Sequence, residues 1–149
     1  MAGYGFAFAI VALAVLLGLM AYVRLAPVDA ALWHKSPAVQ LWEQGGAWDQ
    51  VVPATNGASL RLSAQKTAPR ELLAKLDRVA MATPRTHRIA GSVEEGRITW
   101  TTRSLLGGFP DFTTAEARAD GLYIHARLRF GRSDLGVNAA RLNNWLSQL

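Results

Sequence analysis

The residues with the clearest potential for chemistry are arginines near the C-terminal end of the chain. Arg127 and Arg129 alternate with apolar residues over 122–130, and this period of two is typical of a strand with one polar and one apolar face. Guanidinium groups bind phosphate and carboxylate oxygens bidentately. We therefore predict an open, basic sheet face that contacts phospholipid headgroups or an acidic protein surface, with a merely solvated face as the alternative. The candidate contacts on and beside it are Arg103, Arg127, Arg129, Arg132, Ser133 and Asn138.

A loop at 131–138 connects this strand to a C-terminal helix. The helix is predicted by apolar residues that recur at three- and four-residue spacing over 142–149. Ser133 or Asn138 is expected to cap its first turn, since either side chain can accept from unpaired backbone N–H groups. Beside Arg132, this helix N-terminus would favour an anion, although the spacing of a phosphate loop is absent. A plain strand-to-helix corner is the simpler interpretation.

No arrangement of residues points to catalysis or metal binding. His34, His87 and His125 lie far apart with no ligand spacing, and the chain has no cysteine. A triad of Ser133, Asp134 and His125 would lack the Gly-x-Ser-x-Gly turn that exposes a nucleophilic serine. We therefore predict a non-catalytic protein with no catalytic residues, no cofactor and no metal site.

Residues 1–24 are predicted to form a transmembrane anchor. No charged residue occurs over 5–23, a length close to the roughly 20 residues that span the hydrocarbon core. A cleaved signal peptide is the alternative, but the apolar run is longer than the usual 7–15 or so residues and no basic residue precedes it. Within the helix, Ala14 and Gly18 form a small-xxx-small pair that would let another membrane helix approach closely.

Residues 25–58 are predicted to be a membrane-proximal linker, because Pro27, Pro37 and Pro53 interrupt any long element. Trp33 is expected at the headgroup level of the membrane, where an apolar ring and a polar N–H both find suitable surroundings.

Residues 59–149 are predicted to form an α+β domain, with an antiparallel sheet of four to five strands and two helices packed on one face. The expected strands are 59–63, 85–91, 97–104, 112–119 and 122–130. Asp120 and Gly121 are expected to form a two-residue hairpin turn, which would pair Ala117 with Ile124.

Two motifs resemble a known family. Residues 127–138, RLRFGRSDLGVN, resemble the closing signature of DUF1499, a family of unknown function found in bacteria and plastids. The GFPD motif at 108–111 is similar to the central Gly-Phe-x-Asp element of that family, and the likeness covers about residues 58–149. Phe112 stands where members often carry a second Asp, which puts a paired carboxylate in doubt, and Asp111 is expected to cap a backbone turn. The resemblance implies no catalytic residues.

The net charge of +5 is carried entirely by residues after 23. Nucleic acid is not an expected partner, because the chain has no basic run with interleaved aromatic residues. Arg24 and Lys35 favour a cytoplasmic domain by the positive-inside rule, but a long domain can cross the membrane regardless of charge. The resemblance implies an extracytoplasmic position. We therefore expect a single-pass protein of the bacterial inner membrane with a periplasmic domain.

The expected function is that of an accessory or assembly subunit of a larger membrane complex, with membrane lipids and an integral membrane protein complex as partners. A membrane-anchored domain that binds lipid or a small anion is the alternative. A pocket would favour the second function, whereas a charged surface alone would favour the first.

Overall fold

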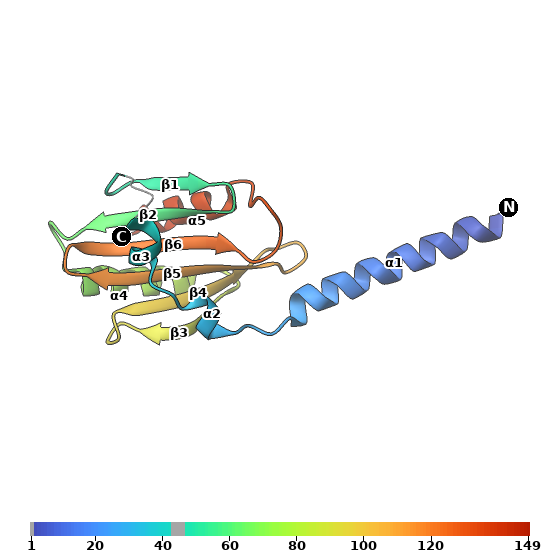
Figure 1. Cartoon of the computed structure of the whole chain (residues 1–149), viewed down its shortest axis with the longest axis horizontal. Helices are drawn as coiled ribbons and strands as arrows, with labels where there is room; N and C mark the ends of the chain where they lie inside the picture. Colours follow the sequence, from blue (N-terminus) through green and yellow to red (C-terminus); the bar gives the residue numbers. More distant parts are fainter. Residues whose placement is uncertain (1, 43–46) are drawn as a thin grey trace.

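The computed structural model describes residues 2–42 and 47–149, and it has an α+β domain preceded by one long helix (Figure 1). The six-stranded sheet has the order β1-β2-β6-β5-β4-β3, and every neighbouring pair is antiparallel. The strands are β1 (Val51–Ala54), β2 (Gly57–Ser63), β3 (Thr86–Ser92), β4 (Arg97–Arg103), β5 (Pro110–Arg118) and β6 (Gly121–Leu128). The helices are α1 (Ala2–Leu25), α2 (Ala30–Trp33), α3 (Pro37–Trp42), α4 (Pro69–Ala82) and α5 (Val137–Leu146). The predicted α+β class and antiparallel sheet are confirmed.

The sheet has six strands rather than four or five, because pairing begins earlier in the chain than expected. β1 lies in the stretch predicted as a linker and pairs along its whole length with β2. Its Pro53 lacks a backbone donor, but β1 is an edge strand with a neighbour on one side only, where proline is tolerated. Pro53, which was predicted to interrupt regular structure, therefore lies within the sheet.

The core lies between one face of the sheet and the helices α4 and α5, which Figure 1 shows behind the strands. Leu73 and Leu76 of α4 are buried against the sheet, as are Leu142 and Trp145 of α5. Trp145 meets Trp100 of β4 edge to face, with ring centroids 6.1 Å apart. This packing fixes α5 on the sheet.

The register of the β5–β6 hairpin differs from the prediction. Ala117 pairs with Leu122 rather than Ile124, and the two turn residues are Ala119 and Asp120. Gly121 belongs to β6 because β2 passes very close to it, and an added Cβ would lie 2.2 Å from the carbonyl oxygen of Leu62. The glycine is thus required by strand packing. Since the pairing shifts by two residues, each side chain stays on its predicted face.

The opposite sheet face is covered, so the prediction of an open basic face is wrong. Residues 26–39, with the short helices α2 and α3, lie across it (Figure 1). The ring of Trp33 stacks on Phe112 with centroids 4.0 Å apart, and Thr114 Oγ1 donates to the Trp33 carbonyl at 3.1 Å. The sequence predicts that Trp33 lies among lipid headgroups, whereas its ring covers an apolar side chain of the sheet. The helix count exceeds the prediction because of α2 and α3.

In α1, the segment Tyr4–Leu25 is long and apolar enough to cross a membrane, and a signal sequence would meet the same criteria. Its side chains are exposed over residues 4–19. By contrast, Val23 is buried, as is Ala26 directly after the helix, and the Tyr22 ring lies 6.3 Å from that of Phe130. The last turn of α1 therefore packs on the domain.

Candidate functional site

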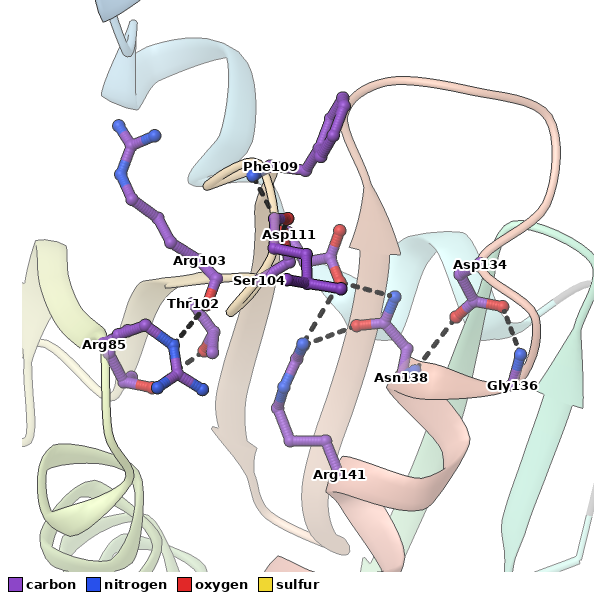
Figure 2. A network of polar contacts seen from close by, with 12 residues as sticks. Arg85, Thr102, Arg103, Ser104, Phe109, Asp111, Asp134, Gly136, Asn138 and Arg141 are labelled. Atoms are coloured by element: carbon purple, nitrogen blue, oxygen red, sulfur yellow. Dashed lines mark hydrogen bonds and ion pairs between the residues drawn. The ribbon is translucent and has the colours of Figure 1, made fainter. Parts of the chain in front are cut away.

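A buried polar network joins β5 to the first turns of α5 (Figure 2). Arg141 Nη2 contacts Asp111 Oδ2 at 3.1 Å, and Arg141 Nη1 donates to Asn138 Oδ1 at 2.6 Å. Asn138 Nδ2 donates to the same Asp111 oxygen at 3.3 Å. Asn138 and Arg141 face one carboxylate because they are three residues apart, on one side of the helix. The sequence predicts a turn cap for Asp111, but its partners come from α5, 27 and 30 residues away.

Asp134, and neither Ser133 nor Asn138, caps the first turn of α5. Its Oδ1 accepts from the Gly136 N–H and its Oδ2 from the Asn138 N–H, each at 3.0 Å. A carboxylate at this place satisfies unpaired donors and complements the positive end of the helix dipole. Gly136, at the N-cap position, adopts a left-handed φ of 82°, which glycine tolerates. The sequence offered Ser133 and Asn138 as caps and missed Asp134. All three residue types cap helices, and only the path of the loop decides which side chain reaches the first turn.

Burial raises the pKa of Asp111, and the charge of Arg141 opposes that effect. The Arg141 side chain is 10% exposed and that of Asp111 16% exposed, so the pair has little contact with solvent. A charged pair with this burial contributes chiefly to the position of α5 on the sheet. We assign the network a structural role.

The candidate arginines of the sheet face bind the membrane-proximal segment of the same chain. Arg129 Nη2 donates to the Pro27 carbonyl at 2.9 Å, and Arg127 donates to the Trp33 carbonyl. Burial lowers the pKa of Arg127. These guanidinium groups therefore hold the segment that covers the face. The six predicted contacts do not form one cluster, because Asn138 is buried in the network while Arg132 and Ser133 lie exposed in the loop before α5.

Acidification should destabilise the domain through His125 on this covered face. Burial, with the charge of Arg127 acting in the same direction, lowers the His125 pKa from 6.5 to about 4. Between these values the unfolded chain binds more protons than the folded chain, so stability is full above about pH 6.5 and falls as the pH falls. We expect the free energy of unfolding, measured for the full chain in detergent, to drop by about 2 kcal/mol between about pH 7 and pH 5 from this group. His125→Gln should remove that part of the drop, and equal losses in both proteins would contradict the assignment.

A second polar feature, which we call the arginine cavity, lies where α1 meets the domain. Arg24, Arg85, His87 and Arg103 supply its ionisable lining side chains, and its volume is about 370 Å³. A neighbouring cavity of about 480 Å³ shares Arg85 and Arg103 and extends to Arg141. None of the described residues that line either cavity is acidic.

Two hydrogen bonds hold two of the three arginines of this cavity in place. Arg85 Nε donates to the Arg103 carbonyl at 3.1 Å, and Arg103 Nη1 donates to the Gly108 carbonyl at 2.9 Å. Arg85 has a left-handed φ of 60°, a conformation that costs a non-glycine residue free energy and is often found at binding sites. Among the described residues, Arg24, Arg85 and Arg103 form no ion pair. The cavity therefore suits an anion.

Sequence reasoning identified Arg103 but missed Arg24 and Arg85. The three residues come from the end of α1, the loop before β3 and the end of β4, and only the fold brings them together. The arginine cavity offers no ligand set for a cation, and the described part of the chain has no group of three or more His, Cys, Asp or Glu side chains that could hold a metal.

The fold and site define a class of protein: an α+β domain with one N-terminal helix that fits a membrane span, and with an arginine-lined cavity at the junction of the two. The chain belongs to the DUF1499 family, proteins of unknown function, whose family model matches residues 46–149. The family that the sequence resembles is thereby confirmed. Comparison with curated proteins and with solved structures gave no match.

Proposed function

We propose that the protein is a membrane-anchored domain that binds phosphate-bearing groups at the bilayer surface. The observation that carries this proposal is the arginine cavity, which Arg24, Arg85 and Arg103 line and in which no described lining residue is acidic. Three arginines that line one concave site make it positive and so attract an anion, and a guanidinium group can bind phosphate oxygens bidentately. Arg24 forms no ion pair with any described residue, and neither do the other two arginines, so their charge is available to a ligand.

The position of the cavity favours a lipid phosphate as the ligand. Arg24 lies in the last turn of α1, beside Gly108 of the β4–β5 loop. With α1 retained as an anchor, this turn lies where the helix leaves the hydrocarbon core, at the depth of lipid headgroups. The packing of Val23 on the domain supports retention, because removal of α1 would expose the surface that it covers. We place the anchor in a bacterial inner membrane with the domain on the periplasmic side.

An accessory or assembly subunit of a larger membrane complex is the second candidate. Its support comes from α1, where Ala14 and Gly18 are exposed and an added Cβ at Gly18 would meet nothing within 4 Å. This leaves a small-residue surface that another membrane helix could approach. The sheet face no longer supports docking, because the chain's own residues 26–39 cover it.

Purification of the full chain in mild detergent, followed by mass spectrometry of bound lipid and protein, tests the proposal. We expect an anionic phospholipid to copurify and to be lost several-fold in Arg85→Gln combined with Arg103→Gln, because binding depends on their charge. Arg78→Gln, which changes an exposed arginine of α4, is the matched control and should retain the lipid. Added salt should mimic the double variant.

The outcomes separate the possible ligands and functions. Binding of inorganic phosphate to the purified chain, with no lipid copurified, would identify a free anion as the ligand. Equal lipid retention by the double variant and the control would contradict the arginine cavity as the site. A stoichiometric membrane protein that copurifies in all variants would favour the accessory-subunit function.

A further inference from the structure

Two loops of the domain expose large apolar side chains at the end from which α1 extends. In the β4–β5 loop, Leu105 is 74% exposed and Leu106 is 83% exposed. In the loop between β6 and α5, Leu135 is 91% exposed. Figure 1 shows both loops at the α1 end of the sheet. Single exposed leucines are ordinary on a protein surface, but loop-tip leucines gathered at one end of a domain indicate a contact surface.

Aromatic contacts tie these loops to the last turn of α1. The Tyr22 ring lies 6.3 Å from Phe130, whose ring lies 6.5 Å from Phe109 of the β4–β5 loop. Gly108 approaches Arg24 so closely that an added Cβ would lie 3.0 Å from the arginine Nε. The two loops therefore lie at the same level along α1 as its C-terminal turn.

The length of α1 sets this level relative to a membrane. The candidate span Tyr4–Leu25 has 22 residues. At 1.5 Å per residue such a helix is about 33 Å long, close to the roughly 30 Å thickness of the hydrocarbon core. A helix that spans the core leaves its last turn at the boundary between acyl chains and headgroups. The loops that contact this turn lie at the same boundary.

Basic side chains surround the exposed leucines. Arg24, Arg85 and Arg103 line the cavity beside the β4–β5 loop, and Arg132 is exposed in the loop that carries Leu135. Asp134 of that loop accepts hydrogen bonds from the first turn of α5. An apolar tip with a basic rim matches a leaflet that contains anionic lipid, since the leucines would enter the acyl boundary and the arginines would meet phosphates.

We propose that the β4–β5 and β6–α5 loops form a second membrane contact, in which Leu105, Leu106 and Leu135 insert into the leaflet where α1 ends. The contact would hold the domain with this end against the bilayer and would present the arginine cavity to headgroups. The inference rests on the retained anchor of the proposed function and is independent of which anion the cavity binds.

Depth measurements on the full chain test this contact. The chain has no cysteine, so Leu106→Cys and Leu135→Cys each give one labelling site for an environment-sensitive fluorophore. Ala119→Cys, in the exposed β5–β6 turn at the opposite end of the sheet, is the control. In vesicles of phosphatidylcholine and phosphatidylglycerol, lipids with a quencher on the acyl chain should quench the two loop labels several-fold more than the control label. An aqueous quencher should show the reverse order.

A second set of measurements shows whether the native side chains or the fluorophore enter the bilayer. Leu105→Asp combined with Leu106→Asp should lower lipid quenching at the label on residue 135 several-fold, because charged tips resist insertion. Unchanged quenching, or aqueous quenching of the loop labels equal to that of the control, would overturn the proposal. Resistance of the membrane-bound chain to alkaline extraction reports separately on α1. A chain that is extracted from the membrane would refute the anchor as well as the loop contact. A chain that stays in the membrane but has solvent-exposed loops would refute the second contact alone.

Discussion

Asp111→Ala should lower the free energy of unfolding by about 3 kcal/mol, because it removes the only ion-pair partner of Arg141 among the described residues. The Arg141 side chain is 10% exposed, so its charge would remain largely desolvated with no carboxylate to balance it. Asn138 would also lose the acceptor of its Nδ2 group, at the turn where α5 meets the sheet. Chemical denaturation of the full chain in mild detergent, followed by tryptophan fluorescence, measures the change.

Two further variants show that the effect comes from the buried charge. Glu71→Ala breaks an exposed pair with Lys75 on α4, and we expect a loss of no more than about 0.5 kcal/mol. Asp111→Leu combined with Arg141→Met replaces both charges by apolar groups of similar size and should recover much of the stability lost in Asp111→Ala. If Asp111→Ala is as stable as the wild type, water reaches Arg141 and the network is not a structural element.

Local patterns in the sequence predicted those features that depend on a single element. The alternation over 122–130 correctly separates Leu122 and Ile124, which face the core, from Arg127 and Arg129 on the other face. The same holds for the apolar spacing of α5, where Trp145 is fully buried. These features follow from periods of two and 3.6 residues, which the backbone imposes.

Features that depend on a distant neighbour were mispredicted. The Asp-Gly pair at 120–121 is a common turn sequence, but β2 requires Gly121 within the strand. The sheet face is covered by residues 26–39, a segment with no regular pattern. It binds the sheet through the Trp33 ring, through backbone carbonyl groups, and through the side chains of His34 and Ser36. Neither contact leaves a local signal in the sequence.

The candidate site shows the same division. Arg103 was recognised because it lies in a well-patterned strand, whereas Arg24 and Arg85 come from a helix end and a loop. One signal in the sequence could have revealed the network. Asn138 and Arg141 are three residues apart on α5, so they lie on one side of the helix, and both face Asp111. An arginine on the inner face of a predicted amphipathic helix indicates a buried acidic partner.

Trp145→Ala should lower the free energy of unfolding by about 3–5 kcal/mol, the range observed when a buried tryptophan or phenylalanine is truncated. Trp145 is fully buried, contacts Trp100 edge to face, and donates from Nε1 to Thr83 Oγ1 at 2.8 Å. Its loss would leave a cavity between α5, α4 and the sheet. Because α5 also carries Asn138 and Arg141, the cavity should loosen the network at Asp111 as well.

Matched tryptophan variants separate the loss of packing from the loss of the hydrogen bond. Trp48→Ala removes a ring that is 38% exposed and lies on Tyr123, so we expect a loss of about 1 kcal/mol. Trp145→Phe keeps most of the apolar volume and removes the Nε1 donor, which should cost about 1 kcal/mol for the bond plus a smaller packing loss. If Trp145→Ala and Trp48→Ala lower the unfolding free energy equally, α5 does not pack as the structure shows. Such a result would also contradict the position of the network at Asp111, because Asn138 and Arg141 belong to the same helix.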